Sequence, residues 1–369
     1  MGVRLPRRRL FQFAAGSVMT LPLAFTRAGS HQSRFDRMPS EGEATPKICL
    51  GASPTLDEAG MRQLKQIGVD AVLMGGPRIP WEDAELRARM DRFAAAGLTI
   101  CNMMISGFND VIWGRPGADA QIEQVIASIR AAGRVGLKVV EYNFYAHRLV
   151  EGYKEEIGRA GAGYTAYDYA LSKGLPPVEG TGTHTRADQL KRARHFLEAV
   201  VPQAEKANVR LALHPNDPPV PFSRGSEQLM ATVDHWKEYL DLVKSPANGM
   251  TFDCGVTRET GADPVEVCRY LGERDRINHV HFRNVVVRTP SIDYTEVFLD
   301  NGQVDMFAVM RELVRQQYPR AIYPEHPRAL DLDRERGIRN QYPGGGGFVG
   351  EVYNVGYARA MLQAALTTR

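Results

Sequence analysis

Short apolar or β-branched runs alternate, from Lys47 onward, with longer segments of helical periodicity. Near-continuous apolar runs separated by helices are typical of a parallel sheet whose outer face is covered. We expect eight such strands, at Lys47–Ala52, Ala71–Gly76, Thr99–Met104, Lys138–Phe144, Arg210–Pro215, Met250–Gly255, Ile277–Asn284 and Ala321–Pro327.

Amphipathic segments between these runs predict the helices. They are Leu56–Ile67, Asp83–Ala96, Ala118–Ala132, Arg186–Ala207, Ser226–Leu242, Pro264–Leu271 and Met306–Gln317. Several end at a glycine just before the next strand, such as Gly68, Gly97 and Gly136, where glycine supplies a left-handed helix cap. Eight β–α units favour an α/β fold of the (β/α)₈ TIM-barrel type. A doubly wound open sheet is the alternative, but no G-x-G-x-x-G follows the first strand.

Two connections are unusually long. The segment from Tyr145 to about Thr185 follows the fourth strand and is rich in glycine, tyrosine and charge. The tail after the eighth strand contains Tyr342 and a run of glycines. Long loops on a rigid barrel commonly cover or line the active site. Because both follow strands, we expect both at the face of the barrel where its chemistry takes place.

The first residues read as a targeting segment. Arg4, Arg7, Arg8 and Arg9 precede an uncharged, mildly apolar stretch. Within it, Arg8-Arg9-Leu10-Phe11 resembles a twin-arginine export signal, an address that admits folded cargo. We expect a signal peptide at 1–28, a polar linker at 29–46 and one barrel domain at 47–369, hence a periplasmic or otherwise exported protein. A basic, disordered start of a cytosolic protein is the other interpretation.

Composition narrows the class of protein. The 369 residues are 43% hydrophobic and 24% charged, which fits one large barrel domain. The net charge of +3 resides in the leader, so nothing points to nucleic acid or an anionic membrane as partner. Four scattered cysteines form no disulfide framework, and no apolar run after the leader could span a bilayer. We expect a small-molecule ligand and leave open a homo-oligomer.

Residues able to bind a metal lie together at the carboxyl ends of the last four strands. His214 ends the fifth strand, Cys254 the sixth, His281 the seventh and Glu325 the eighth. Such ends converge on one mouth of a barrel. Imidazole, thiolate and carboxylate together suit a borderline divalent cation. His279 shares a strand face with His281, but His281 lies nearer the mouth, so we assign the metal to His281.

Each of these residues has an ordinary structural interpretation. A single strand-end histidine is usually hydrogen-bonded scaffold, and a single cysteine is usually a small buried hydrophobe. Four candidates on four successive strands at the same height make coincidence the weaker explanation. Cys49 and Cys101 lie inside early strands and Cys268 lies on a helix, so we expect those three in the core.

The sequence resembles the mannonate dehydratase family, within the xylose-isomerase-like metal-dependent barrels, from about Gly68 to Leu330. The motifs that carry the resemblance are Tyr142-Asn143-Phe144, His214-Pro215-Asn216-Asp217-Pro218-Pro219, Ala247-Asn248-Gly249 leading to Cys254, His281-Phe282-Arg283-Asn284 and Gly302-Gln303-Val304-Asp305-Met306. The resemblance implies a barrel that binds Mn²⁺ or Fe²⁺ and removes water from a sugar acid, giving a 2-keto-3-deoxy acid.

Residue by residue, the resemblance makes His214, Cys254 and His281 metal ligands. Glu325 matches a family aspartate, His326 the catalytic histidine and Arg283 a site arginine. Two departures stand out: Asn216 replaces an aspartate, and the family's Pro-Gly-Tyr appears here as Pro343-Gly344-Gly345. Tyr342, on the other side of the proline, could replace the missing tyrosine.

Dehydration needs a base for the α-proton, a stabiliser of the enediolate and an acid for the departing hydroxyl. A divalent metal can polarise the substrate as a Lewis acid, and Arg283 can bind a carboxylate or support developing charge. His326 titrates near neutrality and is placed to transfer a proton. As substrate contacts we expect Tyr142, Asn143, His147, Asn216 and Asp217, each of which also has a purely structural interpretation.

Other functions fit the same residues. A metal-dependent sugar isomerase or epimerase also moves a proton next to a carbonyl. A lyase acting by β-elimination on a 3-keto-glycoside is a further enzymatic variant. A non-catalytic sugar-binding barrel is the alternative outside enzymes, and an assay of turnover separates it from the others.

Overall fold

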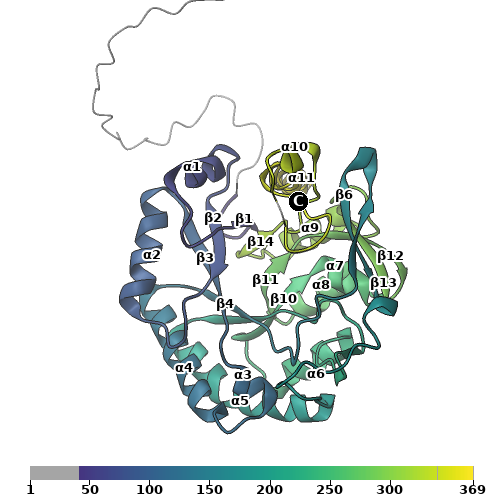
Figure 1. Cartoon of the computed structure of the whole chain (residues 1–369). Coiled ribbons are helices and arrows are strands. Elements are labelled where there is room, and N and C mark those ends of the chain that lie inside the picture. Colours follow the sequence, from purple (N-terminus) through teal and green to yellow (C-terminus); the bar gives the residue numbers. More distant parts are fainter. Residues whose placement is uncertain (1–40, 339, 369) are drawn as a thin grey trace, which may run out of the picture. The chain divides into compact units, whose positions relative to one another are not determined.

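The computed structural model describes residues 41–338 and 340–368, and the signal peptide expected at 1–28 lies outside the described residues. Eight parallel strands close into a barrel in the order β1-β14-β11-β10-β7-β4-β3-β2, which confirms the predicted TIM-barrel fold (Figure 1). The strands are β1 (Lys47–Gly51), β2 (Ala71–Gly75), β3 (Thr99–Ile105), β4 (Val139–Tyr142), β7 (Arg210–Leu213), β10 (Asn248–Asp253), β11 (Ile277–His281) and β14 (Ala321–Tyr323).

Helices follow the barrel strands and bury their apolar faces against them. The predicted ones are found as α1 (Glu58–Gln66), α2 (Asp83–Ala95), α4 (Ala118–Val135), α5 (Arg186–Ala207), α6 (Val233–Leu242), α8 (Pro264–Gly272) and α9 (Met306–Arg315). The prediction for α6 began too early. Ser226 belongs to a small hairpin, and the helix starts only after Thr232, whose hydroxyl accepts the His235 backbone N–H at 3.2 Å.

Several short elements were not predicted from the sequence. They are the helices α3 (Asn109–Trp113), α7 (Cys254–Glu259) and α10 (Asp331–Glu335), the 3₁₀ turns η1 (Arg159–Gly161) and η2 (Tyr169–Leu171), and the hairpin strands β8 (Phe222–Ser223) and β9 (Ser226–Glu227). All lie in connections, and short elements of this kind carry little periodicity.

The long segment after the fourth barrel strand contains part of a second sheet. This antiparallel sheet has the order β12-β13-β6-β5, formed by β5 (Tyr153–Ile157), β6 (Gly163–Asp168), β12 (Asn284–Thr289) and β13 (Asp293–Val297). Strand β6 pairs with β13, more than a hundred residues away in the sequence. Because that pairing is non-local, the sequence alone predicted only a loop here.

The tail after the eighth barrel strand, where the sequence pattern predicts only a long loop, ends in α11 (Phe348–Thr367). Helix α11 packs against α9 and β1, next to the closure of the barrel (Figure 1). None of the described helices is both long enough and apolar enough to cross a bilayer.

Candidate metal centre

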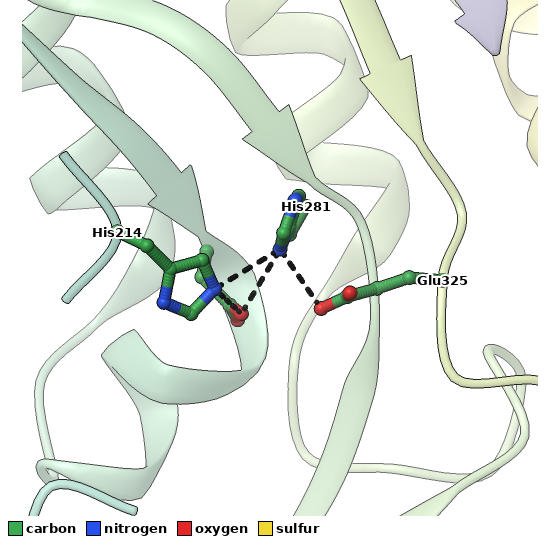
Figure 2. Close-up of side chains that lie close together, drawn as sticks. His214, His281 and Glu325 are labelled. Atoms are coloured by element: carbon green, nitrogen blue, oxygen red, sulfur yellow. Dashed lines mark hydrogen bonds and ion pairs between the residues drawn. The ribbon is translucent and has the colours of Figure 1, made fainter. Parts of the chain in front are cut away.

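Four side chains from successive barrel strands meet at the mouth of the barrel. His214 follows β7, Asp253 ends β10, His281 ends β11 and Glu325 follows β14. One ligand atom from each lies within 4.8 Å of the others. The Nδ1 atom of His281 is 3.1 Å from both Nε2 of His214 and Oε1 of Glu325 (Figure 2).

The neighbours of the two imidazoles decide which nitrogen faces the cluster. Nδ1 of His214 lies 2.7 Å from the Pro215 carbonyl, to which it can only donate, so Nε2 keeps its lone pair. The Tyr145 hydroxyl lies 2.9 Å from the same Nδ1. On the far side of His281, Nε2 is 3.4 Å from the Glu141 carboxylate. A carboxylate behind a histidine orients the ring and makes it a stronger ligand.

The structure corrects one predicted ligand, because Asp253 and not Cys254 reaches the cluster. Asp253 is in register with His281 on the adjacent strand, so both side chains point to the same side of the sheet. Cys254 is the first residue of α7 and is fully buried in the main apolar core. Burial raises the pKa of its thiol well above the usual range. The ligand candidates are therefore two imidazoles and two carboxylates, and not the expected set, which included a thiolate.

His279 and Glu141 lie behind His281 in the barrel interior. Glu141 is almost fully buried and accepts hydrogen bonds from Asn102 and Thr251, each at 2.8 Å. Burial lowers the pKa of His279 to about 4, so this imidazole is neutral at physiological pH. His279 groups with Glu141 and His281 in the barrel interior, whereas His281 also meets His214, Asp253 and Glu325 at the mouth.

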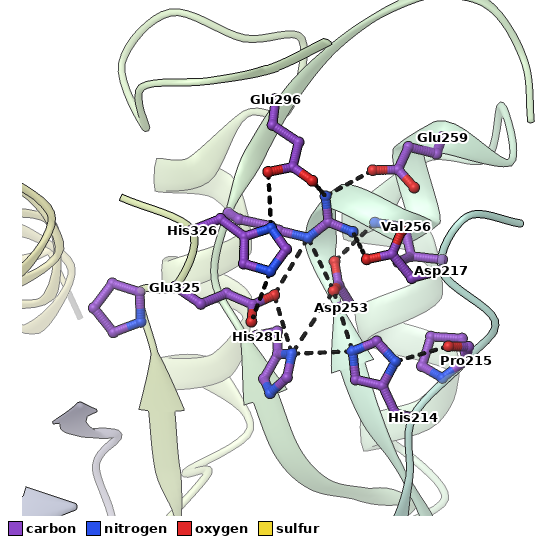
Figure 3. A network of polar contacts seen from close by, with 12 residues as sticks. His214, Pro215, Asp217, Asp253, Val256, Glu259, His281, Glu296, Glu325 and His326 are labelled. Carbon is purple, nitrogen blue, oxygen red and sulfur yellow. Dashed lines mark hydrogen bonds and ion pairs between the residues drawn. The ribbon is translucent and has the colours of Figure 1, made fainter. Parts of the chain in front are cut away.

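Arg283 is surrounded by buried carboxylates, and Figure 3 labels those of Asp217, Asp253, Glu259, Glu296 and Glu325. Its Nε is 3.0 Å from Asp253 and 3.3 Å from Glu325, and its Nη atoms contact Glu259 at 2.7 Å and Asp217 at 3.1 Å. The residue is 1% exposed and does not line the cavity described below. The expected contact between Arg283 and a substrate carboxylate is therefore not supported. Arg283 instead holds two of the four ligand candidates in place.

His326 lies beside the cluster, between two carboxylates. Its Nδ1 donates to Glu296 at 2.8 Å, and its Nε2 is 3.4 Å from Glu325. Burial lowers the pKa of His326, but these two carboxylates outweigh it and the pKa is raised. The backbone φ of His326 is +48°, a left-handed conformation that costs energy for a residue other than glycine. Such strain is typical of functional positions.

A cavity of about 310 Å³ opens directly on the cluster. Its walls come from barrel strands and from the long connections, with contributions from Asn143, Asp217, His326 and Tyr342. Glu351, at the start of α11, also lines it, and burial raises the pKa of this carboxyl to about 7. The cavity therefore places groups able to exchange protons beside the proposed metal position.

Tyr342 enters this cavity despite the flexible glycines that follow it. Its hydroxyl accepts a hydrogen bond from Arg148 at 2.7 Å, and its ring packs edge-on against Tyr153. Gly345 stands where the resembling family has its tyrosine. A Cβ there would lie 2.6 Å from Asn340, so no larger side chain fits without rearrangement. The tertiary structure thus brings Tyr342 to the site and closes the neighbouring position to a side chain.

The remaining expected substrate contacts separate into two groups. Asn143 and Asp217 line the cavity, and His147 lines a second cavity beside it. Tyr142 is buried, and its hydroxyl lies 2.9 Å from that of Tyr239. Asn216 accepts the backbone N–H of Met230 at 2.6 Å. Neither Tyr142 nor Asn216 lines either cavity, so both are corrected to structural residues.

Sequence reasoning missed several residues of the site, namely Asp253, Glu141, Tyr145, Arg148 and Glu351. Strand alternation offered a signal for Asp253. Its side chain lies two positions after Thr251 on the same strand, so both point to the barrel interior. The others come from a strand interior, a loop and a helix whose positions depend on the closed fold.

The cluster fits a divalent cation on the evidence of its own atoms. Oε1 of Glu325, which lies 3.1 Å from Nδ1 of His281, is buried and has no hydrogen-bond partner. Two carboxylates and two imidazoles aimed at one point repel less when a cation lies between them. The four residues that would hold it are His214, Asp253, His281 and Glu325.

Comparison with known proteins identifies a family for the chain. A family model for D-mannonate dehydratase (UxuA) matches residues 183–368. A mannonate dehydratase from Thermotoga maritima is 28% identical over 324 residues, covering 76% of this chain and 88% of the relative. One from Enterococcus faecalis is 27% identical over 319 residues, covering 74% and 87%.

Solved structures show the same fold. The crystal structure of mannonate dehydratase from Streptococcus suis serotype 2 superposes with a TM-score of 0.79 at 24% identity, covering 88% of this chain and 95% of the other. D-psicose 3-epimerase from Clostridium cellulolyticum superposes with a TM-score of 0.54 at 11% identity, covering 87% and 97%. At these identities the likeness concerns the barrel alone.

Substitution of the two neighbouring candidates will decide which one binds metal. We expect Asp253→Asn to weaken Co²⁺ binding more than about tenfold, because a charged ligand is lost. Cys254→Ser should leave Co²⁺ affinity unchanged. Titration calorimetry measures both affinities. A thiolate-to-cobalt charge-transfer band in the spectrum of the Co²⁺-loaded wild-type protein, lost in Cys254→Ser, would show that the thiol is a ligand after all.

Proposed function

The chain belongs to the mannonate dehydratase family, and on that premise we propose that it removes water from a sugar acid, with mannonate as the first candidate. The reaction is a carbon–oxygen lyase reaction. The proton on C2 and the hydroxyl on C3 leave, and the resulting enol becomes a 2-keto-3-deoxy acid. The observation that carries the proposal is the four-ligand cluster at the floor of a cavity that also contains His326.

We infer that Mn²⁺ or Fe²⁺ is the resident metal. A set of two imidazoles and two carboxylates suits these ions, and it lacks the soft thiolate that favours Zn²⁺ or Cu⁺. When bound, the ion would supply Lewis-acid polarisation of a substrate carboxylate or hydroxyl. The protein's own groups would perform the remaining tasks.

His326 and Glu351 are the best-placed groups for proton transfer. Both line the cavity, and each has a shifted pKa, raised for the imidazole and raised to about 7 for the carboxyl. The hydrogen bond from Nδ1 to Glu296 fixes the His326 ring, with Nε2 3.4 Å from Glu325. Tyr342 adds a hydroxyl that Arg148 orients. Groups of this kind can remove the C2 proton and protonate the departing hydroxyl.

Arg148 supports the assignment of an acidic substrate. It lines the cavity, and within the described chain it forms no ion pair with a carboxylate; its hydrogen bond goes to the Tyr342 hydroxyl. The guanidinium of Arg283, in contrast, is already surrounded by carboxylates. We therefore assign the recognition of the substrate carboxylate to Arg148, because guanidinium groups bind carboxylates through paired hydrogen bonds.

Product analysis by NMR in deuterated water tests the reaction. Mn²⁺-loaded protein incubated with mannonate should form a 2-keto-3-deoxy acid with deuterium at C3, because the enol takes up its proton from solvent. A rearranged or deuterated sugar acid that keeps all its hydroxyls would instead indicate an isomerase or epimerase. His326→Asn should lose several orders of magnitude in turnover while Mn²⁺ remains bound; nearly intact turnover would make His326 a scaffold residue.

Replacement of Arg148 tests the substrate's charge. We expect Arg148→Gln to raise the KM for mannonate by about ten- to a hundredfold, the effect of losing a hydrogen bond to a charged group. The KM of Arg148→Lys should lie between that of Arg148→Gln and that of the wild type. Tyr342→Phe is the matched control, since it removes the contact with Arg148 and keeps the guanidinium. An equal rise in KM in Tyr342→Phe would show that Arg148 acts only through Tyr342.

We also propose that the leader directs export of the folded, metal-loaded protein. The support is Arg8-Arg9-Leu10-Phe11 ahead of an uncharged stretch. In a bacterial host with a twin-arginine pathway, the full chain should reach the periplasm, and the Arg8→Lys, Arg9→Lys double variant should stay in the cytoplasm. Fractionation and immunoblotting measure this, and equal distribution of the two proteins would contradict it.

A further inference from the structure

A second cavity of about 240 Å³ adjoins the one that faces the metal centre. It lies at the same end of the barrel, between the end of β3, helix α3 and the loop after β4. The two cavities share the lining residues Met104, Asn143, Tyr145 and Arg148. The second cavity adds about three quarters to the volume of the first, which is more room than a single sugar acid needs.

Two residues that line the second cavity each have a buried polar atom without a hydrogen-bond partner. The two atoms are Oδ1 of Asn143 and Nε2 of His147. The nearest charged group to that Nε2 is the Glu151 carboxylate at 3.6 Å. Buried polar groups are normally paired, so these two unpaired atoms, in side chains that line the cavity, favour a ligand rich in hydrogen-bonding groups. Hydroxyl groups can pair with both atoms.

Two of the residues that line the second cavity, Phe108 and Trp113, are aromatic and held in place. Phe108 stacks on Phe196 with ring centroids 5.4 Å apart and an interplanar angle of 9°. The Trp113 indole N–H donates to the Ala146 carbonyl at 2.7 Å. Fixed aromatic surfaces combined with a few polar groups are suited to the apolar face and the hydroxyls of a sugar ring.

The residues that line the second cavity disfavour a ligand with a second charged group there. Among the described residues around this cavity, Arg148 on the shared wall is the one lysine, arginine, aspartate or glutamate. A phosphate or a second carboxylate deep in the cavity would therefore meet no additional lysine or arginine. A neutral, hydroxylated group matches the walls better.

We propose that the second cavity binds a second sugar ring joined to the sugar acid, so that the substrates include aldobionates, disaccharides that end in an aldonate. The inference rests on the proposed function for the position of the acid, beside the metal centre and Arg148. Asn143, which lines both cavities, marks the place where the two units meet.

Ser106 provides a way to close the second cavity alone. It is exposed, lines the second cavity and does not line the first. Ser106→Phe should occupy the space of the second ring, and Ser106→Ala is the matched control that leaves it open. Titration calorimetry on the Mn²⁺-loaded full chain would compare gluconate with cellobionate, maltobionate, lactobionate and melibionate, which carry a second ring on gluconate through different linkages.

We expect at least one aldobionate to bind about tenfold or more tightly than gluconate, a difference of about 1.4 kcal/mol. Ser106→Phe should abolish that gain and leave gluconate affinity unchanged, while Ser106→Ala keeps both. Equal affinities in the wild type, or a gain that Ser106→Phe does not remove, would overturn the proposal. The turnover of mannonate is a separate measurement: its absence would refute the dehydratase function without removing a gain in aldobionate binding.

Discussion

The arrangement of the centre depends on the buried guanidinium of Arg283. Five carboxylates, those of Asp217, Asp253, Glu259, Glu296 and Glu325, lie within ion-pairing distance of it. Burial alone would lower the pKa of this arginine, but the surrounding carboxylates raise it well above its usual value. Taking so many charges out of water is costly unless each is paired, so the network tolerates few alternative arrangements.

That constraint links the metal ligands to the second sheet. Asp253 and Glu325 contact Arg283 on one side and belong to the ligand cluster on the other. Glu296 lies on β13 and contacts Arg283, His326 and Arg328. Burial raises the pKa of Glu296, yet His326, Arg328 and Arg283 lower it to about 2, so it remains charged. The second sheet, built from the connections after β4 and after β11, therefore positions the proposed catalytic histidine.

The long connections after β4 and after β14 give the site its shape. Tyr342 comes from the tail after the barrel, and Arg148 from the loop after β4; their mutual hydrogen bond joins the two segments over the cavity. A barrel with short loops would present the four ligands to open water. Here the ligands lie at the bottom of a cavity whose walls carry hydroxyl, carboxyl, imidazole and guanidinium groups. Specificity within the family can therefore vary through the loops while the barrel strands stay the same.

The sequence by itself determined the barrel, because eight apolar runs with helices between them have few other ways to bury their surface. It also located His214, His281, Glu325 and His326, since strand ends in a barrel converge whatever the loops do. Only the tertiary structure decided between Asp253 and Cys254, because the turn from β10 into α7 sends one side chain inward and the next into the core. The burial of Arg283 and the exposure of Arg148 to the cavity likewise depend on contacts between segments far apart in the chain. Periodicity reports which face of an element is buried, but it carries no information about which distant charge will lie opposite.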